Sequence, residues 1–211
     1  MENGNSKLMS EENSPAFLRL FIAIAIPPAV RQEIGRAQGQ LRRSVPPGAI
    51  RWTRPEQFHV TLKYLGDVPA GQVAALEKSA VEVCARFSAL RLSANGIGFF
   101  PGAQRPRVIW AGVDEPGGQL AELHRQLDEV MQPFAPAEKP ERFAGHITLG
   151  RFKPGWHAAI PKLQERATRL RQRHFGDWLA GEVEIVRSEL TAAGAMHTPL
   201  VSCRLGQAQF G

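Results

Sequence analysis

The motif His-x-Thr-Leu occurs twice in this 211-residue chain, and this repeat constrains the fold more than any other feature. The first copy begins at His59 and the second at His146, so the two histidines are 146 − 59 = 87 positions apart. This separation is too long for side chains on neighbouring turns of one helix. It suits two copies of a supersecondary unit in one compact domain, so the repeat predicts a duplicated half-domain with one site built from both halves.

Each motif is preceded by the same order of predicted elements. The apolar run Phe17 to Ile26 indicates a buried strand, a helix begins at Pro28, and the first motif strand covers His59 to Leu65. A strand over 107–113 and a helix over 120–130 precede the second motif strand in the same way. The other predicted elements are a strand at 50–52, a helix over 73–87, a strand over 90–99 that forms a hairpin with 107–113, a basic amphipathic helix over Ala158 to Phe175, and closing strands over 182–190 and 200–205. This order predicts an α+β fold of two interleaved lobes.

The composition allows a full hydrophobic core, because 43% of the residues are hydrophobic. We expect residues 16–211 to form a single bilobal domain, whereas the polar composition of residues 1–15 predicts a flexible N-terminal tail. No apolar run reaches the roughly 18 to 20 residues that span a bilayer, and the N-terminus has no signal-peptide pattern. We therefore expect a cytoplasmic protein that does not associate with membranes.

The charge favours an anionic partner, since the net charge is +6 and the sequence pI is about 9.9. Nucleic acid is the partner that such a balance favours, although charge alone does not identify it. The two cysteines, Cys84 and Cys203, have no C-x-x-C spacing. They predict free buried thiols, and neither a zinc site nor a disulfide framework.

The motif residues form a set suited to acid–base chemistry on phosphate. Side chains alternate between the two faces of a strand, so His59 and Thr61 share one face, as do His146 and Thr148. If the two strands face each other across a cleft, one neutral imidazole can deprotonate a water while the other protonates the leaving oxygen, and the hydroxyls can hold phosphate oxygens. Histidine fits because its ordinary pKa, about 6.5, lets both protonation states coexist near neutral pH.

Three other interpretations compete with this one. A metal site would need three or four ligands, and the motifs supply only two, so we expect no metal and no cofactor. A lone histidine is more often a satisfied core residue, but packing would not require His and Thr at matching offsets in both copies. An RNA-binding module with little turnover would rest on the basic helix, and its RNA affinity would be sensitive to salt and would survive alanine at His59.

Several stretches together resemble a known family. They are Arg19–Ala23, Ile50–Trp52, His59–Gly66 and His146–Arg151. The chain resembles the two-histidine phosphoesterase superfamily and, within it, the RNA 2′,3′-cyclic phosphodiesterase family, also called 2′-5′ RNA ligase. The resemblance extends over nearly everything from Phe17 to Leu205. It implies a bilobal, pseudo-twofold fold in which antiparallel sheets line a central cleft and the helices lie outside.

The resemblance also implies an activity and its residues. The family hydrolyses 2′,3′-cyclic phosphate ends of RNA to 2′-phosphomonoesters without a metal, and some members join tRNA halves by a reversible 2′-5′ linkage. By position, His59 and His146 would be the acid–base pair, and Thr61 and Thr148 would hold the phosphate. Arg151 matches a position that contacts the substrate phosphate. The partner would be RNA or a nucleotide with a 2′,3′-cyclic phosphate, and we expect a monomer.

Three expectations concern side chains around the motifs. Simple alternation places Arg151 on the opposite face from His146, so the strand must bulge or end there for Arg151 to enter the site. His197 follows Gly194 at a turn where many relatives carry Tyr, and we expect a turn residue there and not a third catalytic histidine. Tyr64, Trp52 and Phe152 could stack on a nucleobase, although aromatic residues on strands more often belong to the core.

Overall fold

The computed structural model describes residues 17–135, 143–155, 160–192 and 194–206. The predicted tail, residues 1–15, lies outside the described residues. The elements in chain order are β1 (Phe17–Ala25), α1 (Pro28–Arg42), β2 (Ile50–Trp52), η1 (Pro55–Gln57), β3 (His59–Pro69), η2 (Ala70–Gln72), α2 (Val73–Cys84), β4 (Leu90–Phe100), β5 (Val108–Asp114), α3 (Gln119–Met131), β6 (His146–Phe152), α4 (Ile160–Arg169), β7 (His174–Ala180), β8 (Glu182–Thr191) and β9 (Gly194–Arg204).

The strands form one antiparallel sheet in the order β7-β4-β5-β6-β3-β1-β8-β9. Strand β2 pairs with the end of β6, residues 150–152, beyond the part of β6 that pairs with β3. The order is symmetric about the β6–β3 pair, so each motif strand lies at the centre with three strands on its outer side. The backbone pairing repeats with the offset of the motif. Ala25 pairs with His59 and Gly112 pairs with His146, and 112 − 25 = 87.

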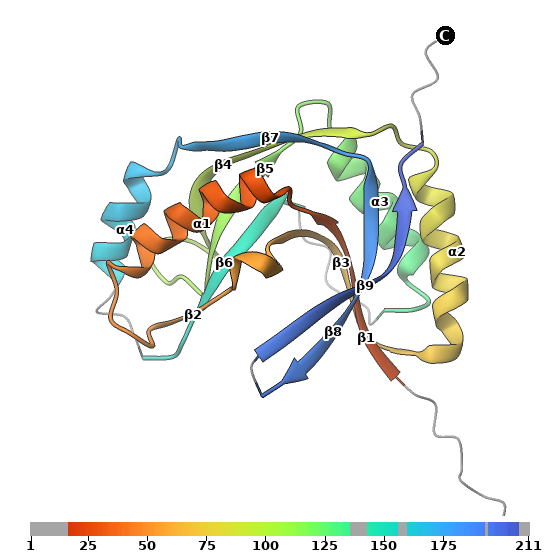
Figure 1. The fold of residues 1–211 in the computed structure, drawn as a ribbon, viewed down its shortest axis with the longest axis horizontal. Coiled ribbons are helices and arrows are strands. Elements are labelled where there is room, and N and C mark those ends of the chain that lie inside the picture. Colours follow the sequence, from red (N-terminus) through yellow and green to blue (C-terminus); the bar gives the residue numbers. More distant parts are fainter. Residues whose placement is uncertain (1–16, 136–142, 156–159, 193, 207–211) are drawn as a thin grey trace, which may run out of the picture.

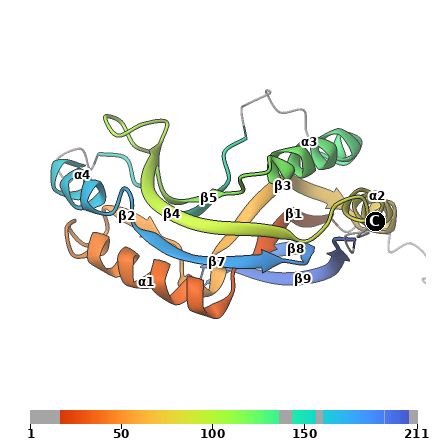
Figure 2. The same cartoon turned by 90° about the horizontal axis from the view of Figure 1, so that it is seen from above.

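The two copies interlock through their first helices. Helix α1 follows β1 but packs against β7 of the other lobe, and α3 follows β5 but packs against β3. Helix α4 joins α1, and α2 joins α3, so one helix pair lies toward each end of the sheet (Figures 1 and 2). The main hydrophobic core contains side chains of all four helices and of the strands beneath them.

The two faces of the sheet differ in what they pack against. On β1, Leu20, Ile22 and Ile24 belong to the main core under the helices. Phe21 and Ala23 point the other way and form a small separate cluster with Val186. This alternation leaves the second face of the sheet free of helix packing at the centre, which is where the motif side chains lie.

The α+β class and the bilobal two-histidine fold are confirmed, with one refinement. The motif strands do not face each other across a cleft but lie side by side in a single sheet, where Val60 pairs with Ile147. Cys84 and Cys203 are buried free thiols, as the sequence predicted. None of the helices in the described ranges has the length and apolar run needed to cross a bilayer.

One predicted helix was too long, and a strand was missed. The basic helix, predicted over Ala158 to Phe175, covers Ile160–Arg169, and strand β7 begins at His174. The strand pattern is hidden because Gly176, with φ of +136°, stands where the β4–β7 register shifts, so buried and exposed residues no longer alternate simply. The last strand also begins at Gly194, earlier than the predicted start at residue 200.

Candidate active site

The four motif side chains converge where β3 and β6 meet. The antiparallel pair Val60–Ile147 has both side chains buried against the core. Residues on either side of this pair therefore point to the other face, and the register sets the histidine of each copy beside the threonine of the other. The resulting neighbours are His59 with Thr148, and His146 with Thr61; all four side chains are partly exposed.

Each histidine is held by the carbonyl group two residues before it. His59 Nδ1 lies 2.7 Å from the oxygen of Gln57, and His146 Nδ1 lies 2.8 Å from the oxygen of Ala144. A carbonyl oxygen can only accept, so Nδ1 carries the proton and donates it in both rings. In the neutral rings this leaves both Nε2 atoms as proton acceptors, as acid–base chemistry requires.

Burial holds both imidazoles neutral in the unliganded protein. It lowers the pKa of His59 to about 4, with smaller lowering effects from His197 and His146. Burial also lowers the pKa of His146, and the charge of Arg151 adds to the effect. The sequence-based argument from the ordinary pKa of histidine therefore does not hold for the free site. A bound phosphate would raise both values, since a nearby negative charge favours the imidazolium.

Aromatic side chains flank both histidines, but they come from different elements. Phe21 on β1 stacks on the His59 ring with 4.7 Å between centroids, and His197 on β9 lies edge-on to His59 at 5.4 Å. On the other side, Phe100 on β4 lies edge-on to His146 at 4.9 Å, and Trp110 on β5 is 6.4 Å away.

A glycine makes room for one of these rings. Gly98 pairs with Trp110, and a Cβ atom at Gly98 would lie 2.2 Å from the indole. The indole therefore lies flat over the backbone of β4 only because residue 98 has no side chain. The aromatic wall beside His146 depends on this contact.

Arg151 reaches the site because β6 bulges. On β5, Trp110 pairs with Thr148 and the preceding residue, Ile109, pairs with Gly150, so Leu149 is an extra residue on β6. The extra residue shifts the alternation by one and returns Arg151 to the face of Thr148 and His146. The bulge that the sequence required for Arg151 is thus present, and the effect of Arg151 on the pKa of His146 agrees with this placement.

A side chain and a backbone N–H of the first copy hold this bulge in the second. The Leu149 carbonyl accepts hydrogen bonds from Gln38 Nε2 and from the backbone N–H of Thr53, both at 2.9 Å. Gln38 lies on α1 and is 7% exposed. Gly150 must be small, because a Cβ atom there would lie 2.6 Å from Ile50 on β2.

Strand β2 sets a second arginine beside Arg151. Arg51 is its cross-strand partner, and both side chains are exposed. Neither makes an ion pair with another residue in the described part of the chain. The sequence reasoning did not assign site roles to the following side chains: Phe21, Gln38, Arg51, Phe100, Trp110 and His197. The 87-residue offset relates Trp110 to Ala23, which pairs with Thr61 as Trp110 pairs with Thr148, but it does not relate Trp110 to Phe21.

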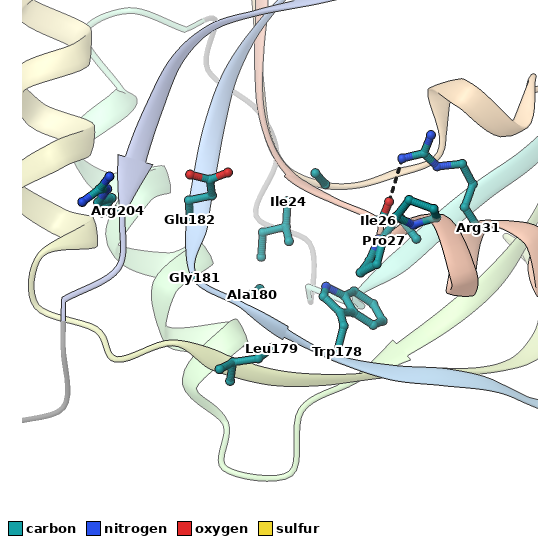
Figure 3. Close-up of a pocket in the computed structure, with 12 residues that line it drawn as sticks. Ile24, Ile26, Pro27, Arg31, Trp178, Leu179, Ala180, Gly181, Glu182 and Arg204 are labelled. Carbon is teal, nitrogen blue, oxygen red and sulfur yellow. Dashed lines mark hydrogen bonds between the residues drawn. The ribbon is translucent and has the colours of Figure 1, made fainter.

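A cavity of about 550 Å³ lies elsewhere, where the end of β1 meets the turn between β7 and β8 (Figure 3). Ile24 and Trp178 line it, and Arg31 beside it donates to the carbonyl of Ile26 at 2.9 Å. No motif residue lines this cavity, so it is separate from the candidate site. Among the described residues there is also no group of three or more His, Cys, Asp or Glu side chains that could hold a metal ion.

Several known proteins are similar to this chain in sequence. A family profile described as LigT like Phosphoesterase matches residues 24–110. A protein of Methanothermobacter thermautotrophicus named RNA 2′,3′-cyclic phosphodiesterase is 31% identical over 89% of this chain and 99% of its own length. One of the same name from Aquifex aeolicus is 28% identical over 74% of this chain and 82% of its own length.

Solved structures show the same fold. A crystal structure from Thermus thermophilus has a TM-score of 0.72 and 27% identity, covering 90% of this chain and 100% of the other. Escherichia coli LigT complexed with 3′-AMP also has a TM-score of 0.72, with 26% identity over 90% of this chain and 99% of the other. The resemblance inferred from the sequence is confirmed: the chain belongs to the LigT-like phosphoesterase family of two-histidine phosphoesterases.

Proposed function

We propose that this protein hydrolyses 2′,3′-cyclic phosphate ends of RNA to 2′-phosphomonoesters, with His59 and His146 as its acid–base pair. The observation that carries the proposal is the twofold arrangement of the two rings: each donates Nδ1–H to a backbone carbonyl, which leaves an Nε2 atom beside the threonine of the other copy. The names of the relatives and the 3′-AMP bound to the Escherichia coli protein support a nucleotide or RNA ligand.

The reaction is a displacement at phosphorus. One histidine takes a proton through Nε2 from a water molecule as the water oxygen bonds to phosphorus. The bond from phosphorus to O3′ breaks, and the other histidine, as imidazolium, donates its proton to O3′. The product has a 2′-phosphate and a free 3′-hydroxyl. Each proton transfer of this kind contributes roughly 10² to 10⁴ in rate.

The remaining site residues would stabilise the phosphate during the displacement. We assign Thr61 and Thr148 to hydrogen bonds with the non-bridging oxygens, where negative charge develops. Arg151, brought to this face by the bulge, would add a charged donor. The phosphate in turn raises the low pKa values of the two histidines, so substrate binding itself favours the protonated form that the leaving oxygen needs.

The same site is suited to joining RNA ends. If the 5′-hydroxyl of a second RNA takes the place of water, its oxygen bonds to phosphorus, O3′ leaves with the proton of the acid, and a 2′-5′ linkage forms. The histidine roles are unchanged. Reversible ligation of tRNA halves is therefore part of the proposal as a secondary activity, and water at bulk concentration favours hydrolysis.

The test is phosphorus NMR of an RNA oligonucleotide with a 2′,3′-cyclic phosphate end, incubated with the protein in excess EDTA. We expect the wild type to give the 2′-phosphate, and His59→Ala and His146→Ala to give almost none while remaining folded. His174→Ala is a matched control, because His174 is a histidine on β7 whose side chain is 54% exposed. A 3′-phosphate product or an unreduced rate in either motif variant would contradict the proposal. RNA binding without turnover would favour a binding module instead.

A further inference from the structure

A third histidine contacts the first motif histidine. The β8–β9 hairpin, whose closed end is at the lower centre of Figure 1, carries His197 to the face of the sheet where His59 lies. The rings of Phe21, His59 and His197 form a triangle with centroid distances of 4.7, 5.0 and 5.4 Å. The His197 ring is steeply inclined to both of the others, at 70° and 72°. The sequence predicted only a turn residue here.

The end of the hairpin is fixed to the segment that also fixes His59. The carbonyl of Ala195 accepts a hydrogen bond from Arg54 Nη2 at 2.8 Å and another from Gln57 Nε2. The backbone carbonyl of Gln57 accepts the Nδ1–H of His59. One residue, Gln57, therefore connects the hairpin that carries His197 to the ring that His197 contacts.

The contact of His197 with the site is made by ring packing. Its two ring nitrogens form no hydrogen bond with any residue in the described ranges. Its half-buried ring lies against two neighbours, and Phe21 alone covers only one face of the His59 imidazole. The two copies differ here in the kind of ring: the ring that lies edge-on to His146 is the apolar Phe100 of β4, and among the described residues no histidine contacts the His146 ring as His197 contacts His59.

We propose that His197 is a positioning residue for His59: its ring, held by the hairpin, restricts rotation of the His59 imidazole and so aims Nε2 at the phosphate. The catalytic meaning of this positioning rests on the proposed function. The Nδ1 hydrogen bond fixes one point of the ring, the stacked Phe21 fixes its plane on one side, and His197 closes a second side. A catalytic group misplaced by about 1 Å can lose up to roughly 100-fold in rate.

The charged and titratable groups near this triangle come from several elements. His146 lies on β6 and Arg54 precedes η1, and both act on the rings of the triangle. Glu184 on β8 pairs with Ala23 on β1, and the charge of Glu182, two residues earlier on β8, acts on Glu184. Removing the His197 ring would reduce the burial of His59 and remove one neighbouring positive charge, and both changes raise the pKa of His59.

The test compares His197→Ala with His197→Phe, which keeps a ring but cannot titrate or donate. Met196→Ala is the matched control, because Met196 is the adjacent residue on β9, is 47% exposed and points to the other side of the strand. For each protein, kcat and KM are measured on the cyclic-phosphate oligonucleotide, and the His59 ring protons are titrated by NMR without substrate.

We expect His197→Ala to lower kcat by about 10- to 100-fold with KM nearly unchanged, and to raise the pKa of His59. We expect His197→Phe to recover most of kcat and Met196→Ala to match the wild type. An unchanged kcat and His59 titration in His197→Ala would overturn the proposal. So would an effect on KM alone, or a His197→Phe variant as slow as His197→Ala, since either would assign His197 a direct contact with substrate. The NMR titration needs no turnover, so it tests the ring contact even if the proposed function fails.

Discussion

The two copies of the half-domain agree at the centre of the site and differ around it. Both supply His-x-Thr on adjacent strands, and both strands bulge at the residue after the threonine, at Leu62 and at Leu149. Beyond the bulge the copies diverge. Lys63 and Tyr64 in the first copy stand where the second copy has Gly150 and Arg151, at the same offset of 87.

Within the described ranges, this divergence accounts for the pair of arginines beside the second motif strand. Lys63 points to the helix side, where its side chain is 6% exposed and its ammonium lies 2.6 Å from Asp128 on α3. Gly150 has no side chain, so Ile50 can pack over it and β2 can join the sheet. Strand β2 then sets Arg51 beside Arg151.

The comparison suggests that the repeated motif residues and the surroundings that differ between the copies have different roles. A displacement at phosphorus needs a proton carrier on the attacking side and another on the leaving side, and a twofold site supplies both at equal spacing. A nucleotide has no such symmetry, so the groups that bind the rest of it must differ between the two sides. The shared centre therefore suits the chemistry, and the divergent surroundings suit substrate orientation.

The largest effects should come from the shared centre and should be equal in the two copies. We expect His59→Asn and His146→Asn each to lower kcat by roughly 10²- to 10⁴-fold, because each removes one of two proton carriers. Single-turnover rates on the cyclic-phosphate oligonucleotide measure this directly. The double variant should be little slower than either single one, since the two rings act as a unit. If one single variant keeps near wild-type turnover, the twofold assignment fails.

The pH dependence of stability should show that burial holds the two histidines neutral. In the folded protein the pKa of His59 is about 4, whereas in the unfolded chain it is about 6.5. Between these values the unfolded state binds a proton that the folded state does not, so stability present above pH 6.5 is lost as the pH falls toward 4. For His59 alone the loss amounts to roughly 3 kcal/mol.

Urea unfolding of the wild type and His59→Phe at about pH 7 and about pH 4.5 measures this loss. The variant should lose less stability between the two pH values than the wild type does. His146→Phe should change the pH dependence in the same direction, because burial also lowers the pKa of His146. A wild type and a His59→Phe variant with identical pH dependence would show that His59 is not held neutral by the fold.

The sequence identified the site residues whose positions follow from patterns within a short stretch of chain, and it missed those placed by contacts between distant stretches. The motif residues, the fold class and the need for a bulge before Arg151 could be inferred, because strand alternation and a repeat are local patterns. Arg51 and His197 could not, because Arg51 pairs with Arg151, 151 − 51 = 100 positions away, and His197 contacts His59, 197 − 59 = 138 positions away, and local patterns specify neither. The low pKa of His59 was missed for the same reason: it arises from burial under rings of other strands.

Arg151 and Tyr64 provide a direct test of the divergent surroundings, since they occupy equivalent positions. We expect Arg151→Ala to lower kcat/KM by roughly 10- to 100-fold, the equivalent of one hydrogen bond to a charged group. Tyr64 is 42% exposed, and Tyr64→Phe should stay within about threefold of the wild type. Steady-state kinetics on the same oligonucleotide compare the two. Equal losses would mean that the phosphate contacts are as symmetric as the motifs.

The smallest effect should come from changing Gln38, through which the first copy supports the bulge in the second. Gln38 on α1 of the first copy donates to the carbonyls of Thr53, at 2.7 Å, and Leu149, at 2.9 Å, and so supports the bulge that precedes Arg151. Removing its amide leaves these carbonyls with fewer donors in a buried place. We therefore expect Gln38→Ala to lower the free energy of unfolding by about 1–2 kcal/mol.

The urea midpoint at unchanged m-value measures this loss, and kcat/KM of the same variant reports whether Arg151 has moved. Gln32→Ala is the matched control, because Gln32 is an exposed glutamine on the same helix. If the bulge depends on Gln38, only Gln38→Ala should lower both stability and kcat/KM. If Gln38→Ala lowers stability but leaves kcat/KM at the wild-type value, the second copy holds its own bulge. The packing of α1 and α3 against strands of the other copy would then stabilise the hydrophobic core without positioning the site residues.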